Sequence, residues 1–264
     1  MSGALALAIL GGSTAGTSTA DPASALLALR RASMKGAEAK GVTQVAKEAE
    51  VKLAISRFTE GIAKAKTVEA ALRDPRVTTV LLPALGLPDA VDSTGLALRA
   101  LMSDPSDSNS VASKLASTDA RWKTAAATLN LATKGLGGLR DASVQKSLTE
   151  AYTSYQWRLS QDDQASGVSD ALYFQQRVST GKELSAYEVL GDAVLRRVVT
   201  GALGLPQTIA IQEVETQARA ITSRLDLSKL TDPKQATKLA ERYVMSANSG
   251  MASGSTSSLL ALFA

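Results

Sequence analysis

Apolar residues recur along most of this chain at intervals of three and four positions, the spacing that places side chains on one face of an α-helix. Polar and charged residues fill the positions between them, so the pattern predicts amphipathic helices that pack on one another. One stripe predicts a long helix over about residues 42–66 and consists of Val51, Ile55, Phe58, Ile62 and Ala65. Another predicts a helix near residues 211–225 and consists of Ile211, Val214, Ala218, Ile221 and Leu225. Asp21 and Pro22 suit the N-cap and first position of an earlier helix.

The sequence Ala-Leu-Gly-Leu-Pro occurs twice, at residues 84–88 and again 118 positions later at residues 202–206. Apolar positions upstream correspond at the same offset, and Thr67 and Ser185 suit equivalent helix N-caps. Glycine at a helix end can adopt the left-handed backbone, and a following proline prevents the helix from resuming. A match at a fixed offset is typical of a duplicated structural unit. We therefore interpret four residues as structural helix stops without a chemical role: Gly86, Pro88, Gly204 and Pro206.

Composition favours the same fold class. Ala and Leu are strong helix formers and are abundant, while only seven prolines interrupt the chain. We expect an all-α multi-helix bundle built from two related helical units, with little or no β-structure. The expected parts are a flexible apolar N-terminal segment (1–20), N-terminal helices (21–66), a first repeat unit (67–133), linking helices with an aromatic cluster (134–184), a second repeat unit (185–247) and a C-terminal tail (248–264).

The chain contains no cysteine and no histidine. This excludes disulfides, thiolate metal ligands and cysteine nucleophiles, and it removes the commonest general base. We therefore expect no catalytic residue, no cofactor and no metal site, and a protein that is not an enzyme. Asp162, Asp163 and Asp170 could form a carboxylate pair or a cation site, but their spacing is not that of a calcium loop, so a solvated loop is favoured. The glycine-rich stretch 135–138 is likewise predicted to be a loop.

The net charge of +4 is concentrated between Arg30 and Lys66, where nine basic residues outnumber four acidic ones. The two signs are interleaved and no aromatic platform accompanies them, so a solvated helix face is favoured and no nucleic-acid partner is expected. No apolar run is long enough to be a transmembrane segment. Residues 4–10 resemble the apolar core of a secretory signal, yet no Lys or Arg precedes them, so a cleavable signal peptide is not expected. Export by another route and a cytoplasmic location both stay open, as does the oligomeric state.

Only 4% of the residues are aromatic, and most of them fall between positions 152 and 187. In a chain so poor in aromatic residues, this group is expected to dominate one hydrophobic cluster. Tyrosine and tryptophan also anchor protein interfaces. Trp157, Tyr173 and Phe174 are therefore candidates for core or interface residues, and core packing is the favoured alternative.

Several motifs occur in a fixed order across the centre and second half of the chain. They are Gly167–Phe174, Ser185–Asp192, Val198-Val199 and residues 202–206. Together they resemble a helical family of unknown function that is found chiefly in alphaproteobacteria and is often encoded beside flagellar genes. The first Ala-Leu-Gly-Leu-Pro element, Asp104-Pro105 and Arg121-Trp122 also fit that pattern. The resemblance covers the chain from about residue 60 to residue 247.

The resemblance implies a non-enzymatic structural or assembly protein associated with the bacterial flagellum, acting through helical protein–protein surfaces. Its partners would be other flagellar or structural proteins. An alternative is a soluble helical module that binds a peptide or a small molecule, with the aromatic segment lining the site.

Overall fold

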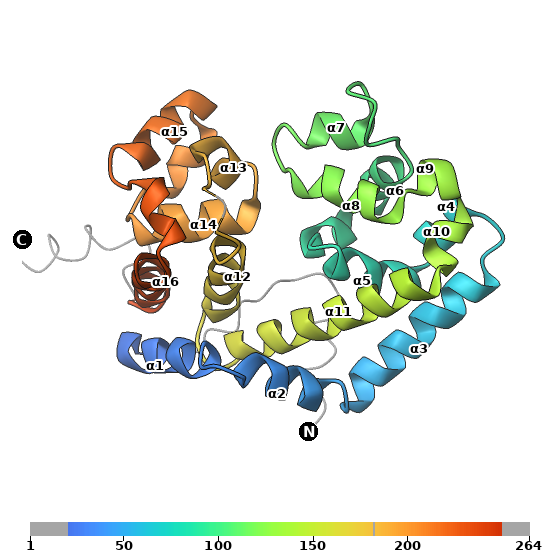
Figure 1. Cartoon of the computed structure of the whole chain (residues 1–264), viewed down its shortest axis with the longest axis horizontal. Coiled ribbons are helices and arrows are strands. Elements are labelled where there is room, and N and C mark those ends of the chain that lie inside the picture. The colour runs from blue at the N-terminus through green and yellow to red at the C-terminus, as the bar shows by residue number, and fades with distance from the viewer. Residues whose placement is uncertain (1–20, 182, 250–264) are drawn as a thin grey trace, which may run out of the picture. The chain divides into compact units, whose positions relative to one another are not determined.

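The computed structural model describes residues 21–181 and 183–249, and the regular elements of this part of the chain are all helical (Figure 1). Sixteen α-helices and three short 3-10 helices follow one another here without a strand. The all-α fold expected from the hydrophobic periodicity is therefore confirmed. The expected N-terminal segment 1–20 lies outside the described residues, as does nearly all of the expected C-terminal tail.

The chain divides into two compact units. Residues 38–157 form one, which we call the central unit. The chain on either side of it forms the other, which we call the terminal unit and which the structure describes over residues 21–37, 158–181 and 183–249. The terminal unit is thus assembled from segments that lie far apart in the sequence. Each unit contains one Ala-Leu-Gly-Leu-Pro element.

In the central unit, α3 packs on α5, and α6 contacts α4, α7 and α8. The apolar face of α3 is buried, with Phe58 and Ile62 shielded completely from solvent, and Leu81 and Leu82 of α5 are buried as well. The elements that contribute to this unit are α2 (Ala37–Val45), α3 (Ala49–Lys64), α4 (Val68–Arg73), α5 (Pro75–Ala84), η1 (Pro88–Ser93), α6 (Thr94–Leu101), α7 (Val111–Leu115), α8 (Arg121–Leu129), α9 (Leu131–Lys134), α10 (Leu136–Arg140) and most of α11 (Ala142–Asp162).

The single helix predicted over about residues 42–66 is two helices, α2 and α3, separated by a turn at residues 46–48. Glu48 has an extended backbone, with φ −63° and ψ 138°, and becomes the N-cap of α3. The prediction is wrong at its N-terminal end because the apolar stripe that supports it begins only at Val51. Gly41, expected to precede the helix, lies inside α2, where any side chain would collide with the indole of Trp157.

In the terminal unit, α16 packs on three other helices, α1, α12 and α14 (Figure 1). Helix α13 contacts both α14 and α15. The elements of this unit are α1 (Pro22–Ala32), the last residues of α11, α12 (Val168–Val178), α13 (Ala186–Leu190), α14 (Ala193–Ala202), η2 (Gln207–Ile211), α15 (Val214–Thr222), η3 (Leu227–Thr231) and α16 (Pro233–Asn248).

Helix α1 begins at the residue that the sequence predicts, and a hydrogen bond joins it to α16. Asp21 Oδ1 accepts hydrogen bonds from the backbone amides of Ala23 and Ser24, which satisfies donors that a helix leaves open at its start. Further along, Arg30 Nε donates to Glu241 Oε1 of α16 at 2.8 Å. The N-terminal helix therefore completes the terminal unit.

The apolar stripe predicted over residues 211–225 is buried over only part of its length. Ala218 and Ile221 lie in the core, but Ile211 is 82% exposed and Val214 is 47% exposed. The reason is that α15 begins only at Val214, so Ile211 belongs to the separate 3-10 helix η2. The Nε2 atom of Gln217 donates to the carbonyl of Gln212 at 2.7 Å and holds this break in place.

Candidate functional site

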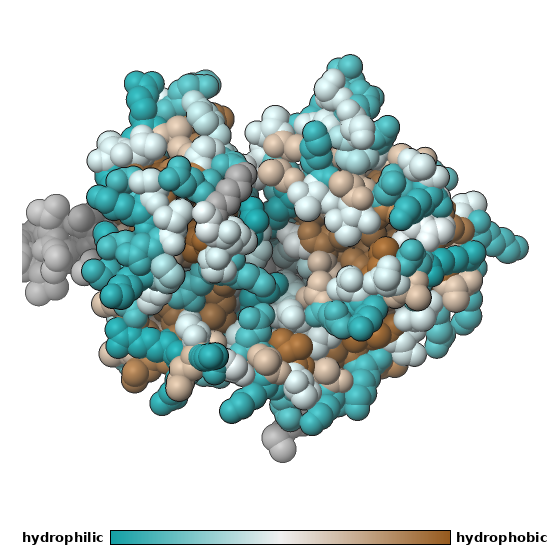
Figure 2. Space-filling model, viewed as in Figure 1, coloured by the Kyte–Doolittle hydropathy of each residue, from teal (hydrophilic) through white to brown (hydrophobic). Residues whose placement is uncertain are grey.

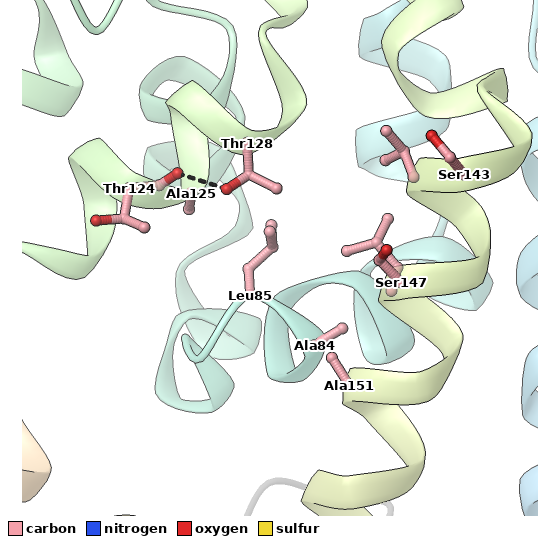
Figure 3. Close-up of a pocket in the computed structure, with 10 residues that line it drawn as sticks. Ala84, Leu85, Thr124, Ala125, Thr128, Ser143, Ser147 and Ala151 are labelled. Atoms are coloured by element: carbon pink, nitrogen blue, oxygen red, sulfur yellow. Dashed lines mark hydrogen bonds between the residues drawn. The ribbon is translucent and has the colours of Figure 1, made fainter. Parts of the chain in front are cut away.

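A groove of about 350 Å³ opens in the central unit between α8 and α11, above the end of α5 (Figure 3). Figure 2 shows apolar side chains exposed in this unit between the same two helices. Ala84 and Leu85 project from the end of α5 into the space between them (Figure 3). The lining residues are Ala84, Leu85, Thr124, Ala125, Thr128, Ser143, Val144, Ser147, Leu148 and Ala151.

No charged side chain lines this groove. Its floor includes Ala125 and Leu148, which are buried, and four hydroxyl side chains stand along its edges. Three of the hydroxyls are engaged locally: Thr128 Oγ1 donates to the carbonyl of Thr124 at 2.9 Å, Thr124 Oγ1 donates to the carbonyl of Ala120 at 3.4 Å, and Ser143 Oγ donates to Asp141 Oδ1 at 2.6 Å. An uncharged groove of this size suits apolar atoms of a partner, with hydroxyls at its edge to fix their orientation.

A second cavity in the central unit, of about 380 Å³, has a different character. Arg73 and Arg99 line it together with Glu69, and all three belong to the exposed surface. The mixture of charges gives this cavity no strong preference for a cation or an anion. We therefore take the uncharged groove as the candidate site.

In the terminal unit, the carboxylate of Asp170 joins three helices. Its Oδ2 atom accepts hydrogen bonds from the Tyr243 hydroxyl of α16 at 2.8 Å and from Arg197 Nη1 of α14 at 2.9 Å. Asp162 Oδ1 accepts from the backbone amide of Ser169 at 2.8 Å. The prediction of a solvated loop is wrong for Asp162 and Asp170, but Asp163 does lie exposed in the turn after α11. Asp162 ends α11 and Asp170 lies in the first turn of α12, and both are half-buried.

Sequence reasoning missed a further carboxylate, which is more deeply buried than Asp162 and Asp170. Asp192 is only 3% exposed, caps α14 by accepting from the amides of Val194 and Leu195, and accepts from the Tyr173 hydroxyl at 2.7 Å. The Asp192-Ala193 start of α14 carries the cap signal in the sequence. The tyrosine partner, 19 residues earlier, has no local signal. The carboxylate of Asp192 accepts these hydrogen bonds from the protein's own groups, so we assign it a structural role.

The candidate aromatic residues are divided between the two units. Trp157 is 6% exposed in the central unit, and Phe174 is completely buried in the terminal unit. Tyr173 is half-buried beside Asp192. The reason for the division is that the two units separate at Trp157, inside α11. None of the three residues lines the groove.

The four residues interpreted as helix stops lie at equivalent places in the two units. Gly86 has φ 76° and Gly204 has φ 63°, each directly after the C-cap of a ten-residue helix. The next amide in each case returns to a carbonyl five residues earlier, at 2.8 Å in the central unit and 2.9 Å in the terminal unit. Pro88 then starts the 3-10 helix η1, and Pro206 precedes η2.

Two further features bear on candidate chemistry. In the described part of the chain, no three acidic side chains gather closely enough to hold a metal ion, and no helix is long and apolar enough to cross a membrane. The glycine-rich stretch 135–138 is not a loop throughout, because Gly137 and Gly138 lie in α10. Only Gly135, with φ 55°, breaks the helix, and a side chain on Gly138 would collide with the carbonyl of Leu129.

Comparison with known proteins places the chain in a family. A crystal structure of a protein from Agrobacterium tumefaciens, an alphaproteobacterium, is similar with a TM-score of 0.66 and 24% identity, covering 85% of this chain and 93% of that one. At this identity the likeness shows the fold. No curated protein matches the sequence. The model of the family described as protein of unknown function, DUF1217, matches residues 45–236, which is more than half of the chain. The chain therefore belongs to the DUF1217 family.

Proposed function

We propose that this protein is a non-enzymatic structural or assembly protein of the bacterial flagellum that binds other flagellar or structural proteins through its helical surfaces. The flagellar part rests on the resemblance of residues 60–247 to a family often encoded beside flagellar genes. The binding part rests on one observation, the uncharged groove between α8 and α11.

The groove suits a helix of a partner protein. Both of its walls are helices that present small or hydroxyl side chains, such as Thr124 and Thr128 on α8 and Ser147 and Ala151 on α11. Small side chains allow a third helix to approach closely, and the buried floor offers apolar surface to its side chains. An amphipathic helix laid into a groove is a recurring mode of protein recognition.

We also infer that the two units are related by duplication. Helices α4–α5 and α13–α14 begin with the side-chain N-caps Thr67 and Ser185. In both pairs an aspartate, Asp74 or Asp192, caps the second helix. That helix is ten residues long in both units and is followed by a glycine in the left-handed region. This correspondence in local geometry supports a common origin of the two units.

Swimming assays test the proposal. A clean deletion of the gene should impair motility or filament assembly, and the intact gene should restore it. Ser147→Trp fills the groove with an indole and should fail to restore motility. Lys146→Trp places the same indole one residue away, outside the groove, and should restore it. Normal swimming and normal filaments in the deletion strain would contradict the flagellar role. Appearance of the protein in culture supernatant through the flagellar exporter would separate an exported component from a cytoplasmic one.

The alternative function is a helical module that binds a peptide or small molecule. The groove volume of about 350 Å³ favours it, because small-molecule pockets begin near this size. The site would be the groove and not the aromatic segment, since Trp157 and Phe174 are buried. An uncharged hydrophobic fluorophore such as Nile red should bind the purified wild type and bind Ser147→Trp more weakly. Such binding together with a normally motile deletion strain would favour this alternative.

A further inference from the structure

The groove between α8 and α11 offers apolar and hydroxyl groups to an occupant and no charge. Leu85, Val144 and Ala151 line it as half-buried side chains, so each of them still exposes apolar surface. Among the neighbouring positions of α11, Lys146 and Glu150 carry charge, but they lie outside the lining and pair with each other at 3.9 Å. A charged occupant would lose hydration in the groove and meet no opposite charge in its lining. The groove therefore favours an uncharged, apolar occupant.

This chain contains a segment with that chemistry. Residues 259–263 read Leu-Leu-Ala-Leu-Phe, and we call them the apolar segment. They fall beyond the described part of the chain, and no charged residue follows Arg242 in the sequence. Leu259, Leu262 and Phe263 have the spacing i, i+3, i+4, which places side chains on one face of a helix. Three large apolar side chains on one face match an uncharged groove between two helices.

The apolar run near the start of the chain matches the groove less well. Its large residues Leu5, Leu7 and Ile9 are separated by alanines. On a helix, neighbouring members of such an alternating series lie about 200° apart, so they do not share one face. A groove between two helices receives side chains from one face of a third. Between the two apolar runs, the spacing therefore favours residues 259–263.

We propose that the apolar segment of one molecule binds the groove of a second copy of this chain. The inference rests on the proposed function, because it takes the groove as the binding surface and names the partner. Each molecule carries one groove and one apolar segment, so it can both accept and donate the contact. Residues 250–258 precede the segment, and nine residues can span at most about 30 Å, which lets the segment reach a neighbouring molecule. Such contacts pair two molecules reciprocally or add molecules in a row.

Sedimentation velocity of the intact chain tests the inference from the side of the segment. The wild type should self-associate as its concentration rises. Phe263→Glu places a charge in the apolar segment and should weaken self-association by about tenfold or more, since a large apolar side chain is no longer buried. Ser253→Glu adds the same charge before the segment and should leave self-association unchanged. A wild type that is still monomeric at about 100 μM, or equal effects of the two variants, would overturn the inference.

Variants of the groove test the same contact from the other side. Ser147→Trp fills the groove and should abolish self-association, whereas Lys146→Trp should retain it. A mixture of Ser147→Trp and Phe263→Glu should associate, because the first contributes an intact segment and the second an open groove. Failure of the mixture to associate would overturn the inference.

A peptide keeps the test decisive if Ser147→Trp does not fold. A labelled peptide of residues 250–264 should bind the Phe263→Glu chain and slow hydrogen exchange in α8 and α11. The same peptide with Phe263→Glu should bind about tenfold more weakly or less. Equal binding of the two peptides, or protection confined to other helices, would overturn the inference.

Failure of this inference differs from failure of the proposed function. If Phe263→Glu restores motility to the deletion strain and Ser147→Trp does not, the groove binds a different partner, which overturns the inference and supports the proposed function. If the chain self-associates through the groove but its deletion leaves swimming normal, the inference is supported and the flagellar role is contradicted.

Discussion

The hydroxyl of Tyr243 donates a 2.8 Å hydrogen bond to Asp170, a residue 73 positions earlier in the chain. The Tyr243 ring also lies against two glycines, because a Cβ atom built on Gly167 or Gly201 would stand 2.9 Å from it. Gly167 has φ 80° as well, so its backbone and its close contact both favour glycine. Helices α12, α14 and α16 thus meet around one tyrosine ring.

Tyr243→Phe should destabilise the terminal unit. Burial, with a further contribution from the charge of Asp170, raises the pKa of Tyr243, so the hydroxyl remains a hydrogen-bond donor at neutral pH. Removing a hydrogen bond to a charged acceptor costs about 1.5 kcal/mol, a fall in Tm of about 3 °C in a chain of this size. Thermal unfolding measures this. Tyr187→Phe removes the same atom from a side chain that is 57% exposed and should leave Tm unchanged. Equal effects of the two variants would contradict the assignment.

Gly204→Val should destabilise the end of α14 through the backbone alone. No neighbouring atom lies within 4 Å of a Cβ built on this glycine, so the added side chain meets no obstacle. The φ angle of 63° is nevertheless disfavoured for a β-branched residue, with a cost of about 1–2 kcal/mol. Urea unfolding measures the change. Gly95→Ala, also in open space but inside α6, should instead stabilise the protein by about 0.5 kcal/mol. An unchanged midpoint in Gly204→Val would show that this backbone conformation is not required.

Local sequence was sufficient to predict the features that depend on neighbouring residues. Asp21 before Pro22 identified the start of α1, and Ser185 was identified as the N-cap of α13, where the structure contains a capping box that Ser185 forms with Glu188. Helical periodicity correctly gave the all-α class and the buried face of α3. Periodicity predicts which face of a helix is apolar, but it contains no information about which element covers that face.

Because periodicity does not show which elements pack together, contacts between residues far apart in the sequence could not be predicted. The Tyr243–Asp170 bond joins helices whose pairing has no local signal, and the close approach of Gly41 to Trp157 joins segments more than a hundred residues apart. The groove was missed because Thr124 and Ser147 have the composition of ordinary exposed helix surface. Only the arrangement of three helices turns these residues into a concave surface.

Asp74→Asn should weaken the central unit at neutral pH but not in acid. The side-chain hydrogen bond from Arg76 lowers the pKa of Asp74, which also caps α5. A lowered pKa contributes stability above the unfolded value, and this is lost as the pH falls through the folded value. The variant should therefore be less stable than the wild type by about 1 kcal/mol at pH 7, with the difference vanishing near pH 2. Urea unfolding at both pH values measures it. Asp89→Asn, at an exposed carboxylate, is the control, and a difference that persists in acid would exclude this origin.

Arg121→Lys should lower the free energy of unfolding far more than Arg76→Lys, although the two arginines have the same local geometry. Each forms two parallel hydrogen bonds, through Nε and Nη2, to an aspartate two residues earlier. Arg121 alone donates a further hydrogen bond, from Nη1 to the carbonyl of Gly86 at 2.7 Å. Its side chain is 12% exposed, compared with 47% for Arg76.

Lysine has one nitrogen and cannot reproduce three hydrogen bonds in the plane of a guanidinium group. We expect Arg121→Lys to lower the unfolding free energy by about 1–2 kcal/mol, because the half-buried carbonyl of Gly86 and the carboxylate of Asp119 lose their shared donor. Arg76→Lys should change it by less than about 0.5 kcal/mol, since exposed ion pairs contribute little. Urea unfolding of both variants gives the comparison. If the two substitutions cost the same, the bond from Arg121 to Gly86 does not stabilise the first helix stop.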